Sequence, residues 1–117
     1  MKTNNIQTAQ NSEHKIYEIV EYILNNYKTI KSIDSLVELS GLEKKYFITL
    51  FRKLTFETPH ALLNKLRLIE GKKLLETTNL SVVQIAKEVG YTSANTFTKL
   101  FTIKMGVSPS IYRKGII

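Results

Sequence analysis

The sequence contains no cysteine and no tryptophan among its 117 residues, and only two prolines and five glycines. Without cysteine there can be no disulfide, no thiolate nucleophile, no thiol redox switch and no zinc site that needs a Cys ligand. No stretch approaches the roughly 18 consecutive apolar residues of a membrane helix. The polar residues 1–12 also lack the apolar segment of a secretory signal. We therefore expect a cytoplasmic protein that does not enter a membrane.

Side chains that carry out catalysis or bind metals are equally scarce. The chain has two histidines, His14 and His60, and a single aspartate, Asp34, with no recognisable spacing among them. Two histidines without cysteine make a poor metal site, and no acid, base and nucleophile come together in a catalytic pattern. We expect no enzymatic activity, no metal and no cofactor.

Acidic residues are also few. The chain has ten Asp and Glu and 17 Lys and Arg, which gives a formal net charge of +7. The excess is localised. Residues 1–30 are neutral overall, whereas residues 61–117 carry nine basic and three acidic side chains. In the segment 44–53 all four charges are positive. A localised basic excess of this kind favours a polyanionic partner.

Apolar residues recur at helical spacing along most of the chain, with no strand pattern, so we predict an all-α fold of about seven helices. The first is capped by Ser12 and runs to Tyr27, after a disordered polar tail over 1–12. The others are expected over 33–40, 44–54, 59–76, 82–89, 93–105 and 109–112. Gly71, inside the helix over 59–76, predicts either a close helix contact or a weak point.

The chain contains an internal repeat. Ser32, Ile33, Leu36, Val37 and Gly41 match Ser81, Val82, Ile85, Ala86 and Gly90 at an offset of 49. Phe47, Leu50, Phe51 and Pro59 match Phe97, Leu100, Phe101 and Pro109 at an offset of 50. A short helix, a glycine turn and a longer second helix form a helix-turn-helix unit, whose second helix fits the major groove of DNA. We predict such units at 13–57 and 77–117, joined by a linker helix over 58–76.

The exposed faces of the two second helices follow from their buried faces. Opposite the phenylalanines lie polar or basic stripes. In the first unit the stripe is Lys44, Lys45, Ile48, Thr49 and Arg52, and in the second it is Ala94, Asn95, Thr98, Lys99 and Thr102. Lys suits guanine or phosphate, Asn can bond adenine bidentately, and Thr or Ile can touch a thymine methyl.

The length of the predicted linker helix is compatible with one chain binding one DNA site. About 18 residues at 1.5 Å per residue span roughly 27 Å, close to the ~34 Å between successive major-groove faces of B-DNA. One monomer could then place both reading helices in adjacent grooves, on an asymmetric site about two helical turns long.

These residues resemble the DNA-binding domain of the AraC/XylS family of bacterial transcription regulators. The resemblance covers about Ile30 to Arg113 and is most specific over Leu80 to Tyr91, at Phe97 and Phe101, and over Gly106 to Arg113. It implies two helix-turn-helix subdomains joined by a linker helix. The implied activity is sequence-specific regulation of transcription on double-stranded promoter DNA, more often activation, through contact with RNA polymerase.

The resemblance also assigns site residues. Base-reading positions would be Lys45, Ile48 and Thr49 in the first unit and Ala94, Asn95, Thr98 and Lys99 in the second. Contacts to the DNA backbone, or bracing of them, are expected from Ser32, Lys44, Arg52, Lys53, Arg67, Ser81 and Thr102. Thr49 stands where the family often has Arg, and Gly71 where its linker has Ala. DNA-repair relatives that accept alkyl groups use a cysteine, which is absent.

Many family members carry a separate effector-binding domain. The residues preceding Ile30 leave no room for one. We therefore expect either a small regulator without a built-in effector domain or a fragment of a longer regulator. Two other functions compete with specific regulation. One is a non-enzymatic helical adaptor that binds an acidic protein, and the other is a nonspecific nucleoid or RNA binder. Neither of them accounts for the duplicated unit.

Overall fold

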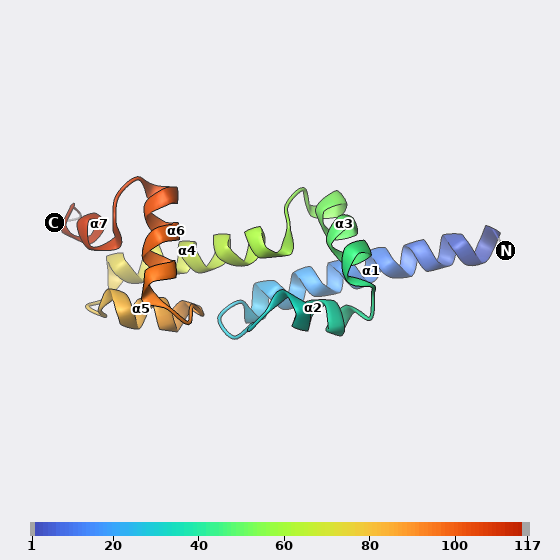
Figure 1. Ribbon diagram of the computed structural model, residues 1–117, viewed down its shortest axis with the longest axis horizontal. Helices are drawn as coiled ribbons and strands as arrows, with labels where there is room; N and C mark the ends of the chain where they lie inside the picture. The colour runs from blue at the N-terminus through green and yellow to red at the C-terminus, as the bar shows by residue number, and fades with distance from the viewer. Residues whose placement is uncertain (1, 116–117) are drawn as a thin grey trace. The chain divides into compact units, whose positions relative to one another are not determined.

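The structure, a computed structural model, describes the backbone of residues 2–115 and the side chains of residues 10–115. Across this range the chain forms seven α-helices and no strand (Figure 1), so the predicted all-α fold is confirmed. The helices are α1 Lys2–Asn26, α2 Ile33–Ser40, α3 Lys44–Thr55, α4 Pro59–Thr77, α5 Val82–Val89, α6 Ala94–Met105 and α7 Pro109–Gly115. No helix of the described chain has the length and apolar character needed to cross a membrane.

The helices form two compact units. Unit 1 comprises Met1–Asn26 and Ile30–Leu63, and unit 2 comprises Tyr27–Thr29 and Asn64–Ile117. Helix α4 starts in unit 1, where the Thr58 hydroxyl oxygen caps it by accepting from the Ala61 N–H at 3.1 Å. The helix ends at Thr77, one residue beyond the prediction.

The start of α1 differs from the prediction. The helix begins at Lys2, so residues 2–12 are helical rather than a disordered tail, and Met1 lies outside the described residues. Ser12 is not an N-cap but an internal position of α1, and its side chain is only 4% exposed. No proline or glycine occurs between Lys2 and Asn26, so nothing in the sequence stops the helix from extending toward the N-terminus.

The core of unit 1 is built from one face of each of its helices. Ile16, Ile19 and Ile23 of α1 are buried at helical spacing. Leu36 of α2 is buried as well, and so are Phe47, Leu50 and Phe51 of α3. The Phe47 and Phe51 rings pack with centroids 5.9 Å apart. Burial of this face fixes which side of α3 is left for solvent.

The core of unit 2 centres on a run of aromatic rings that pack at tilted or edge-on angles. Phe97 lies 5.8 Å from Tyr91 and 5.7 Å from Phe101, and Phe101 lies 5.6 Å from Tyr112 of α7. Leu75, Ile85, Ala86 and Val89 complete the buried cluster. Ile69 is 60% exposed, because Gly71 and not Ile69 occupies the side of α4 that contacts Phe97.

Each unit contains the predicted short helix, glycine turn and longer helix. Ser32 and Ser81 cap α2 and α5, and Gly41 and Gly90 end them in the left-handed conformation, with φ of 70° and 112°. Glycine takes these angles without the steric penalty of a Cβ. The turn then leads into α3 in unit 1 and into α6 in unit 2, the two candidate reading helices.

The last turn of the chain is tied to α4 and the segment after it by Arg113. Its guanidinium donates from Nη1 to the carbonyl of Leu80 at 2.6 Å, from Nη2 to Thr78 at 3.2 Å and from Nε to Leu75 at 3.2 Å. These carbonyls lie at and beyond the C-terminal end of α4, where helices leave acceptors unpaired. Tyr112 adds a hydrogen bond to the Glu76 carboxylate, which raises the pKa of the Tyr112 hydroxyl.

Candidate nucleic-acid interface

Helix α3 presents a basic stripe to solvent. Lys45, Thr49 and Arg52 are all exposed and lie opposite the buried phenylalanines, at i, i+4 and i+7. Glu43 caps the helix, because its carboxylate accepts from the backbone N–H groups of Lys45 at 2.8 Å and Tyr46 at 3.1 Å. These two hydrogen bonds lower the pKa of Glu43, so the cap is ionised at neutral pH and complements the helix dipole.

Residues at the edges of this stripe have neighbours within unit 1. Lys44 forms an exposed ion pair with Asp34 of α2, with an Nζ to Oδ1 distance of 2.8 Å. An exposed pair of this kind is weak, so a phosphate can compete for the Lys44 ammonium. Ile48 is half-buried. Lys53 and Thr49 line a hollow of about 240 Å³ together with Glu13, Tyr46 and Leu50.

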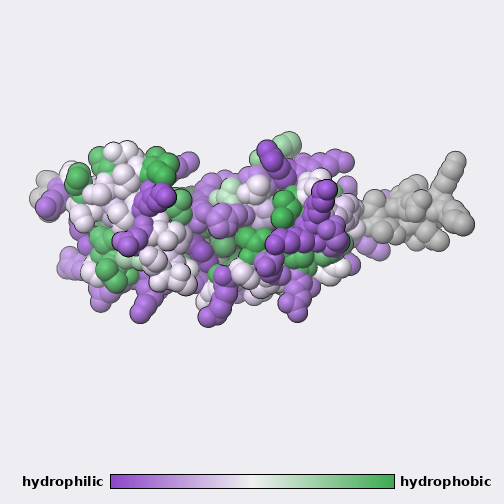
Figure 2. Space-filling model, in the orientation of Figure 1, coloured by the Kyte–Doolittle hydropathy of each residue, from purple (hydrophilic) through white to green (hydrophobic). Residues whose placement is uncertain are grey.

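Helix α6 presents a less charged stripe. Asn95 and Lys99 are exposed, and Thr102 is half-buried, with its hydroxyl donating to the Thr98 carbonyl at 2.6 Å. Ala94 and Thr98 are half-buried at the edge of the stripe. Ser93 caps the helix by accepting from the Asn95 N–H at 3.2 Å. In Figure 2 the purple of hydrophilic residues is strong over α3, whereas near-white, the colour of intermediate hydropathy, is prominent over α6.

The two serine caps lie at the N-termini of α2 and α5. Ser32 and Ser81 are exposed, and their hydroxyl oxygens accept from the N–H groups of Ser35 and Gln84 at 3.2 Å and 3.1 Å. Gln84 returns the contact, since its side-chain oxygen accepts from the Ser81 N–H at 2.8 Å. Both serines are therefore held at a helix end, where N–H groups and the helix dipole favour an anion such as phosphate.

Arg67 is largely buried. It was expected either to contact the DNA backbone or to brace such contacts, and its surroundings are those of a bracing residue. The residue is 7% exposed, its Nε donates to the Tyr27 carbonyl at 3.0 Å, and its guanidinium lies 5.3 Å from the centroid of the Tyr91 ring. Burial lowers the pKa of Arg67 and raises the pKa of Tyr91 to about 12. The aromatic face and the carbonyl draw the long side chain inward, so Arg67 braces unit 2.

The same contact explains why a glycine follows α5. A Cβ on Gly90 would lie 2.8 Å from the Arg67 Nε and 2.8 Å from the Lys28 carbonyl oxygen. Gly90 is thus needed both for its backbone angle and for the close approach of Arg67. The glycine turn sets the angle between α5 and α6, and it also leaves space for the buried side chain of Arg67. The two therefore depend on each other.

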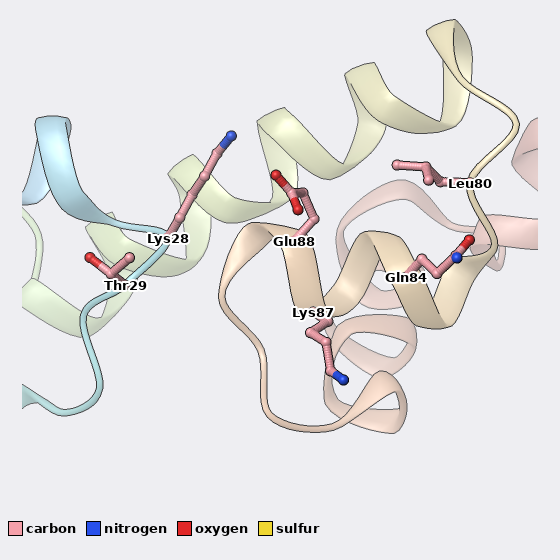
Figure 3. Close-up of a pocket in the computed structure, with 6 residues that line it drawn as sticks. All are labelled: Lys28, Thr29, Leu80, Gln84, Lys87 and Glu88. Atoms are coloured by element: carbon pink, nitrogen blue, oxygen red, sulfur yellow. The ribbon is translucent and has the colours of Figure 1, made fainter.

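A second hollow lies in unit 2. It has a volume of about 590 Å³ and is lined by Lys28, Thr29, Leu80, Gln84, Lys87 and Glu88 (Figure 3). Figure 3 shows Lys87 and Glu88 pointing in different directions from α5. In the described part of the chain, no group of three or more His, Asp or Glu side chains could hold a metal ion.

Three features of the structure were not predicted from the sequence. These are the pairing of Lys44 with Asp34, the bracing by Arg113, and an exposed phenylalanine, Phe56, at the end of α3. The offset of 50 that relates the two second helices sets Phe56 against Gly106 and could have drawn attention to it. The pair of Lys44 and Asp34 joins two different helices, and the sequence repeat gives no indication of it.

Comparisons with known proteins agree with this geometry. A family model described as a helix-turn-helix domain matches residues 36–115. The chain is 43% identical over 97 residues to the raffinose operon transcriptional regulatory protein RafR of Pediococcus pentosaceus, covering 83% of this chain and 35% of RafR. It is 35% identical over 98 residues to the HTH-type transcriptional activator AarP of Providencia stuartii, covering 84% of this chain and 73% of AarP.

A solved structure is similar over most of the chain. The DNA-binding domain of the global transcriptional factor AdpA, crystallised in complex with a target DNA, superposes with a TM-score of 0.80 at 27% identity. The match covers 86% of this chain and 90% of that domain. Against RafR, by contrast, the chain spans about a third of the relative's length.

Proposed function

This chain belongs to the AraC/XylS-type family of helix-turn-helix DNA-binding domains, and from that membership we propose that it is a sequence-specific regulator of transcription that reads two adjacent major-groove segments of promoter DNA. The observation that carries the proposal is the duplicated arrangement of a serine cap, a left-handed glycine and a second helix with an exposed polar stripe. AdpA supports it, since that domain was crystallised on a target DNA.

The base-reading residues are the exposed or partly exposed positions of the two stripes. In α3 these are Lys45, Ile48 and Thr49, and in α6 they are Ala94, Asn95, Thr98 and Lys99. Lys45 and Lys99 suit guanine, Asn95 suits adenine, and the methyl groups of Ile48 and Thr98 suit thymine. Alternatives that bind DNA without sequence preference do not need this mixture of side chains.

Contacts to the DNA backbone come from the residues around the stripes. Lys44, Arg52 and Lys53 offer cations beside the reading positions of α3, and Thr102 borders those of α6. Ser32 and Ser81 place a helix N-terminus toward a phosphate. Such contacts set the register of the protein on the duplex and carry no sequence information themselves.

Each chain binds its site as a monomer, because one chain already contains two reading helices. The name of AarP, a transcriptional activator, favours activation over repression for this chain as well. The protein partner we assign is RNA polymerase, through which the family resemblance implies that activation acts.

The test is selection of a binding site by the full chain from a random duplex library of roughly three helical turns. We expect a preferred sequence, bound far more tightly than random competitor DNA, with log K falling by about 0.9 per neutralised phosphate as log salt rises. Asn95→Ala and Lys99→Ala should relax the selected sequence in one half of the site only. Ile69→Ala, an exposed position of α4 outside both stripes, is the control.

Two results would contradict the proposal. Equal affinity for the selected duplex and random competitor would leave a nonspecific DNA binder. No binding to any duplex would favour the adaptor function, in which the basic surface binds an acidic protein.

A further inference from the structure

Phe56 combines two features that are unfavourable for folding. Its side chain is 90% exposed, the highest value among the large hydrophobic side chains of the described residues. Its backbone has a φ of 67°, and no other non-glycine residue in the described part of the chain has a positive φ. A bulky side chain in the left-handed region costs conformational energy, and an exposed ring returns no packing energy.

The second unit shows that this fold does not require a phenylalanine there. Gly106 occupies the equivalent position at the end of α6, with a φ of 81°. Both residues cap their helix in the same way, since the Phe56 N–H donates to the Arg52 carbonyl at 2.9 Å and the Gly106 N–H to the Thr102 carbonyl at 2.8 Å. The same cap is thus made with the residue best suited to it in one unit and with a strained, exposed aromatic in the other.

The strained turn is held by its neighbour and not by the ring. The Thr55 hydroxyl lies 2.8 Å from the carbonyl oxygen of Phe51 and 2.9 Å from that of Glu57. These contacts bridge the end of α3 and the residue after Phe56. Strain that the surrounding structure maintains, at a position where a relaxed alternative is available, is typical of functional sites.

The position of Phe56 in the chain indicates what the ring contacts. Lys45, Thr49, Arg52 and Phe56 are spaced at i, i+4, i+7 and i+11, so Phe56 continues the exposed stripe of α3. Arg52 and Lys53, the basic residues of the last helical turn, are its near neighbours in the chain. These charges favour a polyanion and disfavour a second copy of the same basic surface.

We infer that the Phe56 ring is an apolar DNA contact, seated against a thymine methyl or a deoxyribose edge at the end of the groove segment read by α3. The inference rests on the proposed function and adds a residue to that interface. It also explains why the two units differ at this position, because only unit 1 then uses the end of its second helix for binding.

Three variants separate the ring from the turn. Phe56→Gly and Phe56→Asn both accept a left-handed backbone and remove the ring, whereas Phe56→Leu keeps apolar bulk. On the duplex selected by the wild-type chain, we expect the first two to raise Kd by about tenfold. The slope of log K against log salt should stay unchanged, because no cation is lost. Phe56→Leu should retain most of the affinity.

Three controls accompany these measurements. Thermal unfolding should show that Phe56→Gly and Phe56→Asn melt no lower than the wild type, which separates a lost contact from a lost fold. Arg52→Ala should also weaken binding, but with the salt slope reduced by about 0.9. Ile69→Ala should bind like the wild type.

The outcomes distinguish this inference from the proposed function. If the wild type selects a site and Phe56→Gly binds it equally well, the ring does not touch DNA and the inference is overturned. The ring would then be available to a protein partner instead. If the wild type selects no site at all, the proposed function fails first and the inference fails with it.

Discussion

Gly71 lies against the core of unit 2 at a position where there is no room for a side chain. A Cβ at this position would lie 2.6 Å from Cε1 and 2.9 Å from Cζ of Phe97, closer than packed carbon atoms approach. Phe97 is fully buried and packed between Tyr91 and Phe101, so its ring has no free space to move into. Of the two interpretations that the sequence allowed, the close helix contact is therefore correct.

We predict that Gly71→Ala destabilises the protein although it improves helix propensity. Alanine gains about 1 kcal/mol over glycine inside a helix, whereas overpacking a rigid core costs typically 1–3 kcal/mol. The expected net change is a loss of roughly 1 kcal/mol in the free energy of unfolding, measured by urea denaturation. Lys72→Ala, exposed on the same helix, should change it by less than about 0.5 kcal/mol.

A double mutant tests whether the Phe97 ring is the cause. Phe97→Leu removes the ring atoms nearest Gly71, so the alanine should cost less in that background, with a coupling energy of at least about 0.5 kcal/mol. An equal cost of Gly71→Ala in both backgrounds would mean that the clash is relieved elsewhere.

Most helices and their ends could be read from the sequence, because their signals are local. Ser32, Gly41, Ser81 and Gly90 each act on the backbone within a few residues of themselves, so type and spacing were enough to place them. The α1 start was misplaced for a related reason. Ser12 has the chemistry of a cap but lies within a helix that has no breaker before it, and only its burial shows this.

What the sequence could not provide were contacts between distant residues. Arg67 joins Tyr27 and Tyr91, and these residues are separated by dozens of positions along the chain. Exposed and buried arginines look alike in a sequence, since a long side chain can reach either solvent or a carbonyl. For the same reason the stripes of α3 and α6 were predictable from helical phase, while the Lys44 to Asp34 pair was not.

At the scale of the two reading helices, the structure predicts unequal electrostatic roles. Lys45, Arg52 and Lys53 are exposed on α3, whereas Lys99 is the basic residue of the α6 stripe. The double variant Arg52→Gln, Lys53→Gln removes two proposed phosphate contacts and should reduce the slope of log K against log salt by up to about 1.8. Lys99→Gln removes a proposed base contact and should reduce the slope by less than about 0.9. Binding titrations of the selected duplex over a range of salt concentrations measure both slopes.

The matched comparison within α6 is Thr102→Ala, which removes a polar residue at the position equivalent to Arg52 without removing charge. Its salt slope should equal that of the wild type. Equal reductions for the α3 and α6 charge variants would show that α3 supplies no extra phosphate neutralisation, and the asymmetry would then have no role in binding.

Over the whole molecule, the net charge lies in one unit. Unit 1 has seven basic and seven acidic residues, and unit 2 has ten basic and three acidic residues, so the +7 belongs to unit 2. Unit 1 is neutral because acids on α1 and α2 balance a basic α3. Unit 2 therefore dominates the long-range attraction to DNA, and unit 1 becomes strongly basic only at the surface of its reading helix.

If both units bind DNA as proposed, binding by one raises the effective concentration of the other at the neighbouring groove segment, because both are on one polypeptide. We predict one chain per selected duplex, measured by sedimentation or native mass spectrometry at concentrations above Kd. Charge-neutral changes in one stripe, such as Asn95→Ala, should shorten the protected footprint from one side and leave the stoichiometry at one. The contrary result would be two chains on every occupied duplex, together with a palindromic selected sequence. Each chain would then use a single reading helix, and the presence of both α3 and α6 in one chain would not be the basis of recognition.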